Sequence, residues 1–203
     1  MALPGDALSS ESVVGSFLPP RNDVKQPLED YDFGGLALND ASQGLEVYTW
    51  RGRYIDGSIV LDVPGIVPEQ TVLTVADITE FQFTFDQNMQ PFVAYMVNDE
   101  DAFYYWFDTT ASEFVTSQLP AGSITPRCML DDKRNASGIL SGFSDIILTY
   151  MREGTLYYRQ QRDRYAIEYT LKEDLDNFEL GQFGMNTKLR LQWQLVPRPP
   201  EEL

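Results

Sequence analysis

Apolar and aromatic side chains at every second position are the feature that most constrains this chain. The alternation runs through three segments, residues 81–85, 165–171 and 189–195. Because neighbouring side chains of a β-strand point to opposite faces of the sheet, this spacing predicts half-buried antiparallel strands. Longer apolar runs at residues 92–97 and 146–151 predict strands that are covered on both faces. No segment has a sustained helical period, and we therefore expect an all-β fold.

The two central segments of the chain are similar to each other. Each reads as a strand, a turn, an aromatic strand, a second turn and a third strand, and their reference residues Asp86 and Asp131 lie 131 − 86 = 45 residues apart. This is close to the ~40–50 residues of a propeller blade. Strands at residues 45–50 and 59–63, joined through Asp56-Gly57, would belong to a third unit. Because a closed propeller needs at least about four blades, we expect propeller-blade-like sheets that stack as a sandwich or are completed by other chains.

Composition divides the chain into three regions. Residues 1–30 contain prolines and serines without a sustained apolar period, which predicts an extended arm. The arm is either a disordered terminus or a segment that lies on a neighbouring subunit, where Phe17 and Leu18 would supply apolar contacts. Residues 31–196 form the predicted β domain with its internal repeat of about 45 residues. Residues 197–203 form a proline-rich tail that cannot continue a central strand.

Composition also excludes several classes of function. The chain has no histidine and one cysteine, Cys128, which removes histidine-activated nucleophiles, internal disulfides and zinc clusters. We expect no cofactor and no bound metal. The 15 basic and 31 acidic residues give a net charge of −16, which would repel a nucleic-acid backbone. No apolar stretch reaches membrane-spanning length and no signal peptide is evident, so we expect no membrane partner and folding in a cytoplasm.

Three features suggest chemistry, and each has a structural alternative. Asp86 and Asp131-Asp132 could form the carboxylate pair of a glycan-cleaving enzyme, but aspartates at strand turns are common. The aromatic string at residues 103–107 could stack on a sugar, but an alternating strand buries half of such a string. Acidic groups at residues 98–101 and 173–176 lack the spacing of a calcium loop and are interpreted as solvated turns. We therefore expect that the protein is not an enzyme.

The segment 157–165 contains the one dense basic cluster of an acidic chain. Arginine pairs with carboxylates and stacks on aromatic rings at protein interfaces, where tyrosine is also enriched. We therefore predict a contact strip in which arginines and tyrosines act together, formed by Tyr157, Tyr158, Arg159, Arg162, Arg164 and Tyr165. The alternative is a turn whose arginines are paired within the chain.

Five segments resemble a family of virion structural proteins of tailed bacteriophages. They are LNDASQGL at residues 38–45, FDQNMQP at 85–91, LDDKR at 130–134, LYYRQQRDRY at 156–165, and GMNT with LRLQ within 184–192. The resemblance extends over roughly residues 31–196. Its shared segments are strands and turns, so it marks no active site and carries over no catalytic residue.

The resemblance implies a component of the tail or neck assembly, with fibre attachment as one role. Its partners would be other tail or neck proteins and copies of itself, in a virion that assembles in the host cytoplasm. A head decoration protein is the main alternative within virions. Outside virions, the alternatives are a carbohydrate-binding or receptor-binding module and, third, a glycan-cleaving enzyme.

Overall fold

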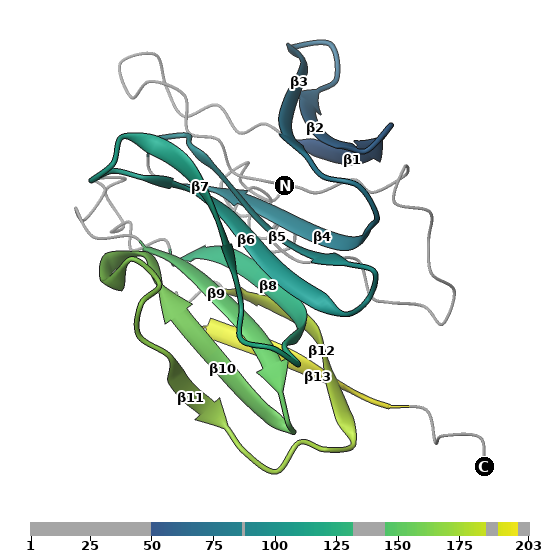
Figure 1. The fold of residues 1–203 in the computed structure, drawn as a ribbon, viewed down its shortest axis with the longest axis vertical. Helices are drawn as coiled ribbons and strands as arrows, with labels where there is room; N and C mark the ends of the chain where they lie inside the picture. The colour runs from purple at the N-terminus through teal and green to yellow at the C-terminus, as the bar shows by residue number, and fades with distance from the viewer. Residues whose placement is uncertain (1–49, 87, 132–144, 186–190, 199–203) are drawn as a thin grey trace, which may run out of the picture.

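The computed structural model describes residues 50–86, 88–131, 145–185 and 191–198 (Figure 1). Regular structure in these residues is β-strand, apart from one short 3-10 helix. This confirms the predicted all-β fold. The predicted arm, residues 31–49 of the predicted β domain and residues 199–203 of the tail lie outside the described residues.

The strands form four antiparallel sheets, numbered 1 to 4 here in chain order. Sheet 1 contains β1 (Arg51–Ile55), β2 (Ser58–Val63) and β3 (Val67–Thr74). Sheet 2 contains β4 (Ile78–Phe85), β5 (Pro91–Val97), β6 (Asp101–Asp108) and β7 (Glu113–Gln118). Sheet 3 contains β8 (Ile124–Asp131), β9 (Asp145–Arg152), β10 (Thr155–Gln160) and β11 (Tyr169–Lys172), with the 3-10 helix η2 (Gln161–Asp163) after β10. Sheet 4 contains β12 (Phe178–Met185) and β13 (Leu191–Pro197).

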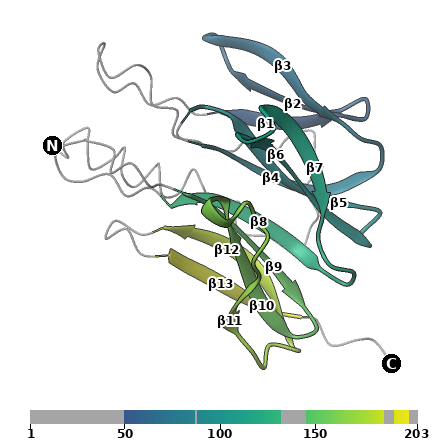
Figure 2. The same cartoon turned by 60° about the vertical axis from the view of Figure 1, so that its left-hand side comes forward.

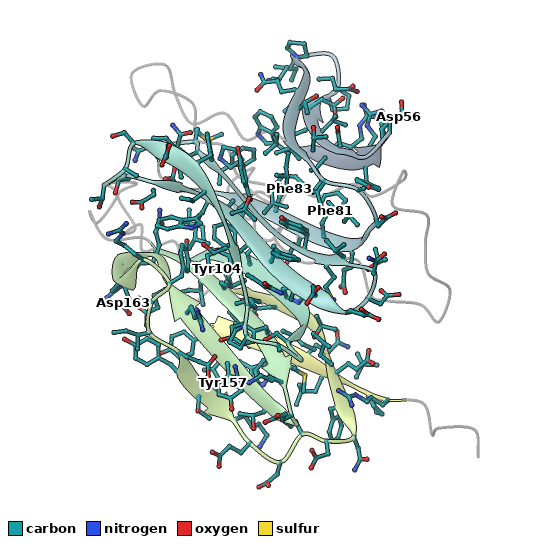
Figure 3. All side chains as sticks on the ribbon, viewed as in Figure 1. Asp56, Phe81, Phe83, Tyr104, Tyr157 and Asp163 are labelled. Atoms are coloured by element: carbon teal, nitrogen blue, oxygen red, sulfur yellow. The ribbon has the colours of Figure 1, made fainter. Side chains whose placement is uncertain are left out.

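The sheets pack face to face in the order of the chain (Figures 1 and 2). Sheet 1 meets sheet 2 in an aromatic core that includes Phe81 and Phe83, whose rings lie on the same side of β4 in Figure 3. Sheets 2 and 3 share a second core around Tyr104. Smaller cores around Phe183 and Leu180 join sheet 3 to sheet 4. The first strands β4, β8 and β12 are neighbours, so sheets 2 to 4 are aligned along one edge of the stack.

Sheets 2 and 3 have the same topology. Each is a meander of four strands in sequential order, and the first strands begin at Ile78 and Ile124, which are 124 − 78 = 46 residues apart. The hairpin between β1 and β2 turns at Asp56-Gly57, where both residues have positive φ (48° and 74°). This is the left-handed pair that a two-residue hairpin turn requires. Sheets 1 and 4 have three and two strands in the described residues, fewer than the sheets in the middle of the stack.

The prediction that the strand at residues 81–85 has one solvated face is wrong. Sheet 3 covers the face of β4 that carries Gln82, and the side chain of Gln82 is only 1% exposed. Its Oε1 accepts a hydrogen bond from the Cys128 backbone N–H at 2.9 Å, and its backbone carbonyl accepts one from the Cys128 thiol at 3.5 Å. A buried amide is tolerated because a partner strand satisfies it. The polar side chain therefore joins two sheets rather than facing water.

Two other predicted strands differ from those observed. The strand expected at residues 165–171 begins only at Tyr169, because Arg164 and Tyr165 have positive φ (50° and 58°) and reverse the chain. The strand expected at 189–195 is observed as β13, while residues 189–190 lie outside the described part. Pro197 ends β13 at a sheet edge, where a missing N–H is tolerated. The strand expected at 45–50 is described only at Trp50, which precedes β1.

Arg127 on β8 connects three sheets at their aligned edge. Its side chain is fully buried and forms an ion pair with Glu80 of β4. Its Nε also donates to the Gly181 carbonyl of β12 at 3.4 Å. Because a buried charge is tolerated only when it is paired and hydrogen-bonded, these contacts define how sheets 2, 3 and 4 meet.

Candidate functional site: the connection between β10 and β11

Tyr165 lies in the core and not on the predicted contact strip. The reversal at residues 164–165 turns its ring between sheets 2 and 3, where it is 1% exposed. The ring packs against Phe92, Tyr104 and Trp106, with centroids 5.1–5.2 Å away. Burial raises the pKa of the Tyr165 hydroxyl well above its usual value. The expectation of a surface contact for this ring was therefore wrong, since the period-two pattern does not report the turn.

Arg159 joins the connection to sheet 3. Its Nε donates to the Tyr150 hydroxyl at 3.0 Å, and an Nη donates to the Tyr165 carbonyl at 3.0 Å. Its guanidinium also lies 3.5 Å from the carboxylate of Glu168. These contacts hold both ends of the reversal, so Arg159 positions the connection within the chain.

Glu168 accepts hydrogen bonds from several groups at once. Arg152 binds it with two donors, at 2.7 and 3.1 Å, and the Tyr150 hydroxyl also donates to it. Burial opposes ionisation of this carboxyl, but the hydrogen bonds from Arg152 and Tyr150 outweigh it and lower the pKa of Glu168. The Arg152 guanidinium in turn lies over the Tyr157 ring, 4.6 Å from its centroid. We call Tyr150, Arg152, Arg159 and Glu168 the Glu168 network.

Arg162 and Arg164 form ion pairs with carboxylates that are almost buried. Arg162 pairs with Asp145 of β9, and Arg164 reaches across to Asp108 of sheet 2. Asp108 also accepts the Thr110 backbone N–H at 2.9 Å, and despite the opposing effect of burial its pKa is lowered by these bonds. The side chains of Arg162 and Arg164 remain 47% and 55% exposed. The pairing matches the alternative interpretation of a salt-bridged turn, while contact with a partner stays a prediction.

Tyr157 and Tyr158 lie on opposite faces of β10. Tyr157 stacks on Tyr150, with centroids 5.8 Å apart, on the side of sheet 2. Tyr158 stacks on Tyr169 of β11 with centroids 4.8 Å apart, and it packs on the core shared with sheet 4. The Tyr169 hydroxyl donates to Asp163 at 2.8 Å. The predicted strip is therefore divided between two faces, and Phe17 and Leu18 lie outside the described residues.

The other sequence candidates have structural roles where they are described. Asp86 Oδ1 accepts the backbone N–H groups of Asn88 and Gln90 at 2.8 and 2.9 Å, as a turn-forming aspartate does. The side chains of Asp131 and Asp132 lie outside the described part, so no carboxylate pair is seen or excluded. In the aromatic string, Tyr104 and Trp106 belong to the core between sheets 2 and 3.

β13 is a surface feature that the contact-strip prediction missed. Among the described strands it pairs with β12 alone, and its Trp193 is 37% exposed. Its sequence, LQWQLVP, contains no charged residue. The absence of charge from a strand at the end of the stack was the available signal, but the sequence alone did not place this strand at an edge.

Within the described ranges, no group of acidic or cysteine side chains is arranged to hold a metal ion. None of the described segments is a helix long and apolar enough to cross a membrane. Comparison of the chain with family models, with curated proteins and with solved structures finds no match. The site must therefore be interpreted from its own geometry.

Proposed function

We propose that the protein is a non-enzymatic structural subunit of a tailed-phage virion. It would belong to the tail or neck assembly and act through contacts with copies of itself and with other tail or neck proteins. The family resemblance suggests the particle, and the geometry of the stack suggests the mode of action. We also infer that the sheets are blade-like units completed by neighbouring chains.

The observation that carries this proposal is the unequal size of the sheets. Among the described residues, the two inner sheets have four strands each, whereas sheets 1 and 4 have three and two. Within this part of the chain, a short terminal sheet leaves part of its four-stranded neighbour uncovered and exposes an edge strand. Open edges and partly covered aromatic faces are surfaces that other chains can bind.

The described contacts fit a rigid connector better than a catalyst. The arginines and carboxylates of the connection between β10 and β11 are engaged with one another, and Arg164–Asp108 joins two sheets. Such pairing gives a stable scaffold. The Tyr150 hydroxyl does lie beside the Glu168 carboxylate, but Arg152 and Arg159 occupy that carboxylate, and burial raises the pKa of Tyr150, which disfavours its use as a nucleophile.

Particle composition tests the proposal. Virions purified from the encoding phage should contain the chain at a fixed copy number by quantitative mass spectrometry. Antibodies against the chain should label the tail or neck in electron micrographs. Labelling over the whole head would indicate a decoration protein instead, and absence from purified particles would contradict a virion role.

Binding to a glycan array tests the alternative that the protein is a carbohydrate-binding module. One observation favours it, namely that Tyr105 and Phe114 stack with centroids 4.9 Å apart and Phe114 is 37% exposed. Such a pair offers a flat aromatic surface to a sugar. Binding that is lost in Phe114→Ala would support a receptor module, and the structural proposal predicts no glycan-dependent binding.

A further inference from the structure

We propose that the outer edge of β13 is a strand-addition site, and that its occupant is the N-terminal arm, residues 1–30, of a second copy. This inference rests on the proposed role as an assembling subunit and adds the surface that joins the copies. The arm would add a third strand to sheet 4 and cover the Tyr158–Tyr169 stack.

The first argument is the absence of charge on β13. Charged residues on an edge strand commonly prevent pairing with another chain. Every other described edge strand contains at least one, and these residues are Arg51 and Arg53 (β1), Glu69 (β3), Glu80 (β4), Glu113 (β7), Arg127 and Asp131 (β8), Lys172 (β11) and Glu179 (β12). β13 differs from all of them, since Leu191–Pro197 is uncharged in a chain of which 23% is charged.

The second argument is the aromatic surface beyond this edge. Leu195 of β13 packs against the core that contains Leu156 of β10 and that Leu171 of β11 also contacts, so β13 lies toward β10 and β11. Trp193 pairs directly with Phe183 and therefore shares its face, which is turned toward sheet 3. Tyr158 and Tyr169 are only half-buried, although they stack on each other. A strand beside β13 would lie over this stack and bury it.

Symmetry argues that the added strand is not β13 of another copy. Two antiparallel edges pair about a two-fold axis perpendicular to the sheet, which places sheet 3 of both copies on the same face of the joined sheet. Sheet 3 has four strands against the two of sheet 4 and extends past β13, so the two copies of sheet 3 would overlap. The occupant must therefore be a strand that carries no sheet on that side, as an extended arm does.

The position of the described N-terminus suits a contact with a second copy. Forty-nine residues precede Trp50, which contacts Phe85 in the core between sheets 1 and 2, at the opposite end of the stack from sheet 4. The chain's own arm would have to run past up to three sheet intervals, about 30 Å at ~10 Å per interval, which residues 31–49 could span, so an intrachain contact is the alternative that the cross-linking below tests. Donor and acceptor at opposite ends suit a head-to-tail contact between copies. Val13-Val14 and Phe17-Leu18 are short apolar groups that the arm offers to an aromatic surface.

Cross-linking between full-length chains tests the occupant. One population carries Phe17→Cys, and the other, isotopically labelled, carries Gln194→Cys; a bis-maleimide is added after mixing. Background from Cys128 is low, because its thiol is fully buried and burial raises its pKa. The matched control is Gln70→Cys on β3, which is an exposed glutamine on a charged edge.

We expect mass spectrometry to find the interchain 17–194 product at least about tenfold above the 17–70 product. Equal yields for the two positions would overturn the site. If the double variant Phe17→Cys/Gln194→Cys cross-linked within one chain while the mixed populations did not, the assignment to a second copy would be overturned.

A charge at the edge gives a second, independent test. Gln194→Lys should weaken self-association in sedimentation velocity by about tenfold or more, while Gln70→Lys should leave it unchanged, with circular dichroism confirming the fold of both. Normal association of Gln194→Lys would contradict the proposal.

If the chain is found in virions but this variant incorporates normally, the docking site fails and the virion role stands. If the 17–194 link forms but virions lack the chain, the docking site stands and the virion role fails.

Discussion

At the residue scale, Glu168 is a single carboxylate that several donors share. The substitution Glu168→Gln keeps the shape of the side chain but removes the charge that Arg152 and Arg159 contact. Because hydrogen bonds to charged groups contribute about 1.5–3 kcal/mol, we expect the free energy of unfolding to fall by about that amount. Urea denaturation measures it, with Glu113→Gln at an exposed position as the control. Equal effects of the two variants would show that the network adds no stability.

The Glu168 carboxylate also makes the free energy of unfolding depend on pH. Its pKa is lowered in the folded chain, as are those of Asp62, bound by Arg51, and Asp108. A lowered folded pKa means that the unfolded chain takes up protons first, so this stability is present above the ordinary carboxyl pKa of about 4 and is lost as pH falls through the folded pKa. We expect the free energy of unfolding to decrease between about pH 5 and pH 3. Glu168→Gln should show a shallower decrease, and an unchanged slope would contradict the assignment.

Two substitutions of Tyr165 separate the contribution of its ring to the free energy of unfolding from that of its hydroxyl. Its buried hydroxyl has no hydrogen-bond partner among the described residues. Tyr165→Phe should therefore unfold at an equal or higher denaturant concentration, whereas Tyr165→Ala removes the ring between two sheets and should cost about 3–5 kcal/mol. Equilibrium denaturation of both variants compares them directly. A large loss in Tyr165→Phe would mean that the hydroxyl is satisfied.

At the element scale, the close approach of β1 to sheet 2 depends on Gly52. A Cβ atom at this position would lie 2.6 Å from Cε1 of Phe83. Gly52→Ala should thus destabilise the chain by about 1–3 kcal/mol through overpacking. Phe83→Leu, which shortens the opposing side chain, should reduce the cost of Gly52→Ala by at least about 0.5 kcal/mol in a double-mutant cycle. Strict additivity of the two losses would place the strain elsewhere.

The sequence predicts these elements better than it predicts their surroundings. Alternation identifies the strands around Phe83 and Trp193, because it depends on local geometry alone. It cannot tell that Gln82 faces a second sheet, since that depends on the order of packing. Nor does it reveal the turn at Tyr165, where the apolar spacing continues while the backbone reverses. The arginine cluster is visible in the sequence because its members are close together in the chain. Its partners Asp108 and Asp145 are not, because they are distant in the sequence and the pairing depends on how the sheets pack.

At the scale of the whole molecule, the inner sheets of the stack have more described strands than the sheets at its two ends. Sheets 2 and 3 are joined by a buried aromatic core and by Arg164–Asp108, whereas sheets 1 and 4 have fewer described strands. Rigid inner layers with incomplete outer layers suit a part that is completed by its neighbours. Assembly should then protect sheet 4 more than sheet 3 from hydrogen exchange, because only sheet 4 gains a strand.

Cryo-electron microscopy of the intact particle tests the central claim most directly, since it reports location, copy number and contacts together. We predict density for the four-sheet stack in the tail or neck, with an additional strand beside β13 contributed by an adjacent copy. Particles without this chain, or density in which the ends of the stack contact no neighbouring protein, would contradict the account.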